Sequence, residues 1–160
     1  MAIITLNNNS LSSVTALPAG VGGKVLQVVT STPTDIFSTT STSLVDTPYS
    51  ITITPTATNS KMIVEFSGNW GKDSISGRTQ MTVLGNSAGS FNAIKTSSYA
   101  SWSTTSNTNM DIIRVVEDSV GTTNPVTYKL QTRAVTPGVT VYVSVNGNDA
   151  SLCTVYEIAG

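Results

Sequence analysis

The chain has 160 residues, a formal net charge of −1 and a charged-residue content of only 11%, less than half of the roughly 25% that is usual for soluble domains. This length suits one domain with its own buried core. The few basic residues are scattered and no apolar run is long enough to cross a bilayer, so neither nucleic acid nor a membrane is an expected partner.

The N-terminal region is polar and glycine-rich: Leu6 to Val29 reads LNNNSLSSVTALPAGVGGKVLQVV. No Lys or Arg precedes Lys24 and no continuous apolar stretch follows Met1, so we expect no secretory signal and synthesis in a cytoplasm. The apolar residues of this region are spaced too irregularly for an amphipathic helix. They are Ile3, Ile4, Leu6, Leu11 and Leu17.

After Lys24, apolar and polar residues alternate with a period of two, which is typical of half-buried antiparallel strands. The apolar residues at alternate positions are Tyr49, Ile51, Ile53, Met62, Val64, Phe66, Val126, Tyr128, Leu130, Val139, Val141, Val143 and Val145. Roughly eight or nine short strands with turn segments between them, and no helical segment, are typical of a β-sandwich. The sequence therefore predicts an all-β domain, an antiparallel β-sandwich of the jelly-roll kind.

Three polar segments are interpreted as turns or loops. Asn-Gly in NGND (146–149) predicts a tight hairpin between the strand before it and the strand after it, because both residues tolerate positive φ. The adjacent Glu117 and Asp118 at a strand end either point to opposite faces or lie in a turn, and a solvated turn is the prediction; GKDSISGR (71–78) predicts a solvated loop.

Two strand segments, DIIRVVED (111–118) and SLCTVYEI (151–158), lack a clean polar face. In the first, Ile112 and Val116 fall on one side of the strand while Ile113 and Val115 fall on the other. Such a strand either packs its outer face on a neighbouring chain or runs buried on both sides inside the sandwich. Because obligate oligomer interfaces resemble a core cut in half, these strands favour an oligomer.

Chemistry-bearing residues are nearly absent. The chain has no histidine, and a single cysteine, Cys153, for which we expect a buried and inert thiol. This composition excludes a Ser-His-Asp or Cys-His nucleophile and a zinc site, and nothing pairs two carboxylates across a cleft. We therefore expect no enzyme activity, no catalytic residue, no metal and no cofactor.

Aromatic residues offer the remaining candidate contact. Tyr99 and Trp102 lie in SSYASWSTTSNTNM, a polar segment expected to be loop-rich. Exposed aromatic rings in such a setting can stack on sugars or anchor a protein partner. The alternative is structural, with Trp102 and Trp70 capping the sandwich core or a subunit seam.

Several segments resemble small virion surface proteins of tailed bacteriophages. They are TALPAG…GKVLQV (Thr15 to Val28), SITITPTATNSKMIV (Ser50 to Val64) and the final TVYEIAG. The resemblance covers most of the chain, but 69–109 carries no matching motif. It implies a trimeric jelly roll of the tumour-necrosis-factor or C1q type, tethered to a larger particle by its N-terminal segment.

This resemblance suggests an attachment arm at 1–23 and a folded domain at 24–160, with the glycines at 20, 22 and 23 as the joint. The arm would bind the major capsid protein or another virion protein through the apolar residues named above. The implied function is a non-enzymatic capsid decoration protein or short head fibre at the virion surface, present as a homotrimer. The alternative is a tail-fibre tip or other receptor-binding protein that recognises host glycans through Tyr99 and Trp102.

Overall fold

The computed structural model of the protein describes residues 23–100, 108–143 and 151–160, with the backbone alone at 96–100 and 108–111. Within these ranges the chain forms ten strands and no helix, which confirms the all-β prediction. In chain order the strands are β1 (Val25–Ser31), β2 (Phe37–Thr39), β3 (Val45–Ile53), β4 (Lys61–Lys72), β5 (Thr79–Gly85), β6 (Asn92–Ala100), β7 (Thr108–Glu117), β8 (Val126–Ala134), β9 (Val141–Val143) and β10 (Leu152–Ile158).

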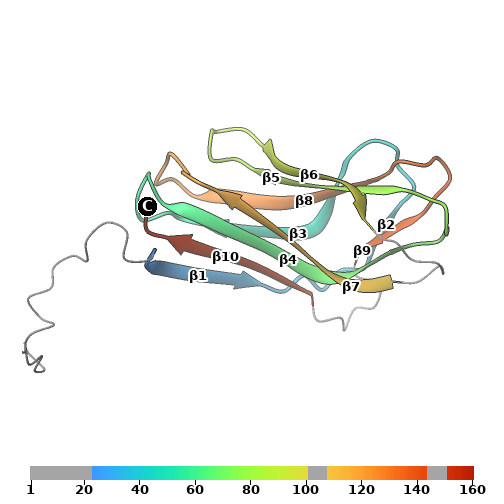
Figure 1. The fold of residues 1–160 in the computed structure, drawn as a ribbon, viewed down its shortest axis with the longest axis horizontal. Helices are drawn as coiled ribbons and strands as arrows, with labels where there is room; N and C mark the ends of the chain where they lie inside the picture. The colour runs from blue at the N-terminus through green and yellow to red at the C-terminus, as the bar shows by residue number, and fades with distance from the viewer. Residues whose placement is uncertain (1–22, 101–107, 144–150) are drawn as a thin grey trace, which may run out of the picture.

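The strands form two antiparallel sheets that pack face to face (Figure 1). Sheet A has the order β1-β10-β4-β7, and the short strands β9 and β2 extend it; sheet B has the order β3-β8-β5-β6. Apart from the β5–β6 hairpin and the steps from β1 to β2 and from β9 to β10, every connection crosses from one sheet to the other. A six-stranded and a four-stranded sheet connected in this way form a jelly-roll-like sandwich, so the predicted fold class is confirmed.

The core lies between the two sheets, and the residues expected to face inward fill it. In β3, β4 and β8 these residues are at most 4% exposed: Tyr49, Ile51, Ile53, Met62, Val64, Phe66, Val126, Tyr128 and Leu130. Trp70, near the end of β4, packs edge-on against Tyr49 with ring centroids 6.2 Å apart. Trp70 is therefore a core residue, in line with the structural alternative given above.

Strands β9 and β10 run in the same direction along one edge of β4. β10 pairs with Lys61–Ser67 and β9 with Trp70–Lys72, while β7 occupies the other edge. The hairpin predicted from NGND is therefore wrong, because β9 and β10 pair with β4 rather than with each other. Residues 144–150 connect two strands that follow one another along an edge, an arrangement that turn propensity alone cannot indicate.

Two polar residues that we expected in solvent are held by the fold. Lys72 is buried, and its Nζ donates to the carbonyl oxygen of Gly77 at 2.6 Å, so part of the predicted solvated loop is anchored internally. Glu117 lies within β7 and accepts a hydrogen bond from the hydroxyl of Tyr128 at 2.5 Å. The predicted solvated turn is thus wrong for Glu117, whereas the neighbouring Asp118 is exposed.

The two described chain ends lie together at one end of the sandwich (Figure 1). The N–H of Ala159 donates to the carbonyl oxygen of Lys24 at 2.9 Å. Gly23 is so close to β10 that a Cβ there would come within 2.4 Å of Cγ2 of Ile158. At the opposite end, β6 stops beside the start of β5, and β7 starts beside the end of β4. β6 therefore ends, and β7 begins, at the end remote from Gly23.

Candidate interaction surface

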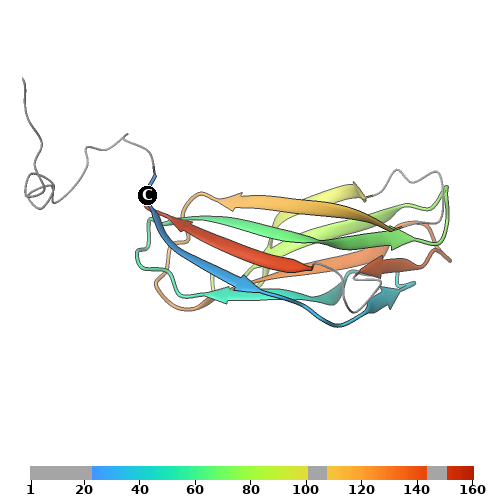
Figure 2. The ribbon, with the colours of Figure 1, turned by 90° about the horizontal axis from the view of Figure 1, so that it is seen from below.

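An apolar row crosses the outer face of sheet A from one edge to the other. The register places Val28 of β1 beside Tyr156 of β10, Tyr156 beside Ile63 of β4, and Ile63 beside Val116 of β7. Cross-strand neighbours on one face of a sheet contact one another. The four strands lie side by side in Figure 2, although they come from distant parts of the sequence.

Val28 and Val116, at the two ends of the row, are exposed, and Tyr156 and Ile63 between them are partly exposed. Val28 is 50% exposed and Val116 is 48% exposed. A second apolar row on the same face joins Leu152 and Ile112 through Ser67 of β4, with Leu152 at 38% and Ile112 at 55% exposure. We call the outer surface of sheet A that contains these two rows the apolar face.

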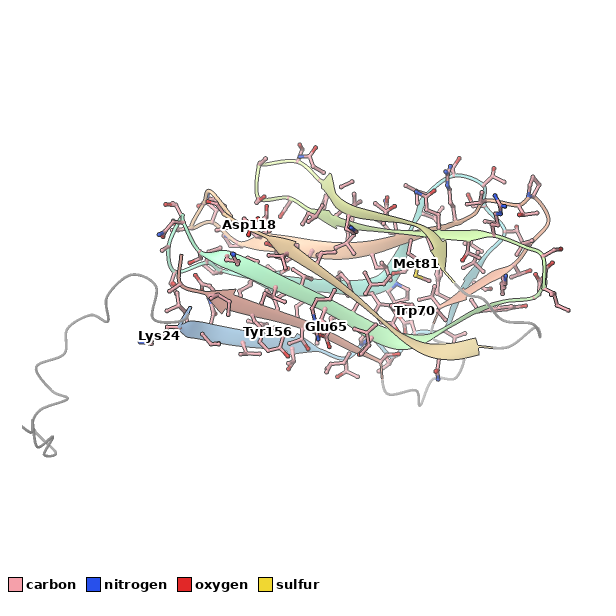
Figure 3. All side chains as sticks on the ribbon, in the orientation of Figure 1. Lys24, Glu65, Trp70, Met81, Asp118 and Tyr156 are labelled. Carbon is pink, nitrogen blue, oxygen red and sulfur yellow. The ribbon has the colours of Figure 1, made fainter. Side chains whose placement is uncertain are left out.

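A polar row separates the two apolar rows. It runs from Thr30 through Thr154 and Glu65 to Arg114, and the guanidinium Nε donates to Oε2 of Glu65 at 2.8 Å. At the margin of the face, Nζ of Lys61 lies 3.0 Å from a carboxylate oxygen of Asp118. These two acids and two bases pair within the chain, so the charges of these rows cancel. Figure 3 shows Glu65 and Tyr156 on neighbouring strands of this sheet.

Strand β7 decides between the two interpretations of DIIRVVED. It is an edge strand of sheet A, with Val115 buried in the core and Ile113 partly buried against it. Ile112 and Val116 point to the opposite side and are exposed. A strand buried on both sides inside the sandwich is therefore wrong. A neighbouring chain over the outer side stays a prediction.

The outer face of sheet B has the opposite character. Its centre is a ladder of polar β8 side chains that bond to their neighbours on β3 and β5. The carboxylate of Asp46 accepts from Lys129 at 2.8 Å and from Gln131 at 2.6 Å, and these bonds hold its pKa below the ordinary value. Thr52 and Thr127 share a hydrogen bond of 2.8 Å. Several polar side chains of this face therefore bond to one another, although the buried hydroxyl of Thr82 has no hydrogen-bond partner among the described residues.

Sheet A carries a carboxylate on its inner side. Glu157 of β10 is fully buried and accepts hydrogen bonds from Ser60 at 2.6 Å, from Gln27 at 2.7 Å, and from the N–H and hydroxyl of Thr56 at 2.7 and 2.8 Å. Burial by itself raises a carboxyl pKa, but these four donors outweigh it together and lower the pKa of Glu157 to about 2. The carboxylate ties β1 and the 54–60 connection to β10.

The described residues contain little that could perform chemistry. Cys153 is buried beneath the apolar face, and burial raises the pKa of its thiol to about 12, which agrees with the expected inert cysteine. Among residues 23–100, 108–143 and 151–160, no cluster of His, Cys, Asp and Glu side chains is suited to a metal ion. The same ranges contain no helix that is long and apolar enough to cross a membrane.

Most of the candidate contact residues from the sequence lie outside the described residues. This applies to Trp102 and to the five arm residues Ile3, Ile4, Leu6, Leu11 and Leu17. Tyr99 lies in β6, whose backbone the structure describes at that position without the side chain. The structure brings none of these residues together, and their roles stay predictions.

The sequence pattern indicated only part of the apolar face. The two-sided apolar character of 111–118 and 151–158 pointed to β7 and β10. Ile63 and Val28 gave no such signal, because each is one apolar residue on the outer side of an ordinary strand. Only the register of four strands places them in one row.

No protein-family model matches the chain, and no curated protein matches it. Among solved structures, the chain is similar to the crystal structure of the infectious bursal disease virus VP2 subviral particle, with a TM-score of 0.48 and 15% sequence identity. The match covers 82% of this chain but only 37% of that one. The chain therefore corresponds to a minor part of the VP2 chain, and a similarity this low says nothing about its function.

Proposed function

We propose that the protein is a non-enzymatic structural component of a bacteriophage virion, a homotrimeric decoration protein or short head fibre at the particle surface. The observation that supports it best is the apolar face, which a soluble monomer would leave in water. The attachment to a virion and the number of three copies rest on the sequence resemblance to virion surface proteins. The jelly-roll topology is compatible with that resemblance.

Self-association suits the composition of the apolar face. Contiguous exposed apolar patches mark interaction sites, and fully burying one Val or Ile side chain contributes about 1.5–3 kcal/mol. The ion pairs Glu65–Arg114 and Lys61–Asp118 leave the face without net charge. A strongly acidic or basic partner therefore has no electrostatic advantage there, whereas another copy meets no repulsion.

Attachment through the N-terminal segment agrees with where the chain enters the sandwich. Lys24 lies at the same end as Ala159, bonded to it, and β1 starts immediately afterwards. An arm before Gly23 would therefore hold the domain by this end and leave the remote end to face away from the particle. We propose 1–23 as the arm, with Ile3, Ile4, Leu6, Leu11 and Leu17 as its apolar contacts.

The assembly is tested by placing a charge on each outer face. Val116→Lys puts an ammonium into the apolar row, and Ser50→Lys puts the same group on the exposed outer face of sheet B. Sedimentation equilibrium should show a trimer for the unaltered protein and for Ser50→Lys, and a monomer for Val116→Lys. A stable monomer for the unaltered protein at micromolar concentration contradicts the proposal.

Attachment is tested with particles that lack this protein. Deletion of residues 1–23 should leave a trimer that no longer binds such particles, because the domain keeps its apolar face. If the truncated protein binds as well as the full chain, attachment lies in the domain. Incubation with peptides, esters or host polysaccharides should show no turnover, since the chain has no histidine to activate a nucleophile.

One observation favours a second candidate, a tail-fibre tip or other receptor-binding protein. β6 ends and β7 begins at the end remote from Lys24, and Trp102 lies between these two strands in the sequence. A domain attached at one end presents its other end outward, where a host glycan would be met. Binding of the protein to host glycans that is lost in Trp102→Ala, with the trimer intact, would favour this candidate.

A further inference from the structure

The polar row in the middle of the apolar face is difficult to explain as a stability feature. An exposed cross-strand ion pair contributes only about 0.2–1 kcal/mol. If a second copy covers both apolar rows, the Glu65–Arg114 pair between them is covered as well. Burial of an ion pair commonly costs more than its attraction returns, unless its remaining donors and acceptors find partners.

The pair has hydrogen-bonding capacity to spare. Arg114 donates from Nε and Nη2, and both bonds go to the same oxygen of Glu65, Oε2. A guanidinium carries five N–H donors, so three of them are unused within the described part of the chain, as is Oε1 of Glu65. The side chain of Arg114 is 62% exposed, whereas that of Glu65 is 18% exposed. The unused donors therefore lie on the open side of the face.

We propose that the Glu65–Arg114 pair is the specificity element of self-association: the spare N–H groups of Arg114 bind Glu65 of a neighbouring copy across the apolar face. This inference rests on the proposed self-association and names its partner, a second copy of this chain. Each copy brings both a spare donor group and a spare carboxylate oxygen. No other charge is needed, because Lys61 and Asp118 already neutralise each other.

The position of the pair between the two apolar rows allows it to fix how two copies align along their strands. Rows on one face of a sheet repeat every two residues, which is about 6.6 Å along the strand. A neighbour displaced by one row would set the ion pair against Ile63 and Tyr156, or against Leu152, and bury the spare N–H groups of Arg114 and Oε1 of Glu65 without partners. Burying hydrogen-bonding groups without partners is unfavourable, so shifted arrangements are disfavoured. A single polar element in an apolar seam fixes register in coiled coils by the same means.

The test exchanges the two charges. The double variant Glu65→Arg, Arg114→Glu keeps an ion pair within each chain and between identical copies, but opposes like charges when it meets an unaltered copy. After unfolding, mixing with isotope-labelled unaltered protein and refolding, native mass spectrometry should show mixed oligomers depleted at least tenfold below the statistical ratio. Each protein alone should keep its trimer.

Each other outcome has a defined meaning. Statistical mixing overturns this inference and leaves the proposed self-association standing, whereas a monomeric unaltered protein overturns both. If the double variant does not fold, the single variants Glu65→Arg and Arg114→Glu replace it: neither should form trimers alone. Trimers formed equally well by each single variant would also overturn the inference. Exchange of Asp46 and Lys129 on sheet B is the matched control and should mix freely.

Discussion

The two sheets of the sandwich arrange polarity in opposite ways. Sheet B follows the usual pattern, with an apolar inner face and an outer face where Asp46 and Lys129 pair and the polar neighbours bond to one another. Sheet A carries a carboxylate, Glu157, on its inner side and apolar rows on its outer side. Strands of both sheets alternate between inward and outward residues, so the difference lies in which residues occupy the outward positions.

This difference indicates which outer face is suited to contact with water in a monomer. The outer face of sheet B has hydrogen-bonding groups that suit water, and covering it would require replacing those bonds. The outer face of sheet A gains free energy when it is covered, because Val28 and Val116 are about half exposed. With only 11% charged residues in the chain, few ions elsewhere keep such a surface apart from its copies. The four predictions below address this contrast, from the largest effect to the smallest.

Replacing Glu157 by alanine should have the largest effect. The change leaves the donors of Gln27, Thr56 and Ser60 without their acceptor in a buried site. Unpaired buried donors cost about 1–3 kcal/mol each, and partial access of water reduces the sum, so we expect a loss of about 3 kcal/mol. Urea denaturation measures it. A loss below 1 kcal/mol would show that the inner carboxylate is dispensable for sheet A.

The stabilisation that the Glu157 carboxylate gives the unaltered protein should be lost at low pH. The pKa of Glu157 is lowered from 4.5 to about 2, mainly by its hydrogen bonds. Since the folded-state pKa lies below the unfolded one, the stabilisation is complete above pH 4.5 and is lost as the pH falls towards 2. Denaturation midpoints between pH 6 and pH 2 should therefore fall more steeply for the unaltered protein than for Glu157→Gln. Parallel curves would contradict the assigned pKa.

Making the outer face of sheet A resemble that of sheet B should weaken association and leave the fold intact. The double change Val28→Thr, Val116→Thr keeps shape and strand propensity but adds two hydroxyls to the apolar row. We expect about 2 kcal/mol less association free energy, roughly a 30-fold rise in the dissociation constant measured by sedimentation. The reverse change on sheet B, Ser50→Val with Thr52→Val, is the control and should create no association of its own.

The smallest effect is expected from a change on the polar outer face of sheet B. Asp46→Asn removes the ion pair with Lys129, in which the Asp46 side chain is 56% exposed. Exposed pairs contribute about 0.2–1 kcal/mol, so unfolding free energy should fall by no more than that, with the oligomer unchanged. Dissociation of the oligomer in this variant would place the interface on sheet B and contradict an interface on the outer face of sheet A.

Local pattern was sufficient for much of this molecule. The alternation of Tyr49, Ile51 and Ile53, and of Val126, Tyr128 and Leu130, identified the inward side of two strands correctly, because a strand exposes every second residue to the same side. The two-sided strands also pointed to part of the apolar face. The NGND prediction failed since Asn-Gly reports a preferred backbone conformation and not which strands pair across it.

The sequence by itself determined the fold class, the inward residues, the inert cysteine and the scarcity of catalytic groups, because these follow from composition and from a period of two. Only the tertiary structure decided that Val28, Tyr156, Ile63 and Val116 form one row, and that Glu65 faces Arg114. Neighbours in a sheet are set by strand order and register, which join residues far apart in the chain. The contrast between the two outer faces exists only once those pairings are made.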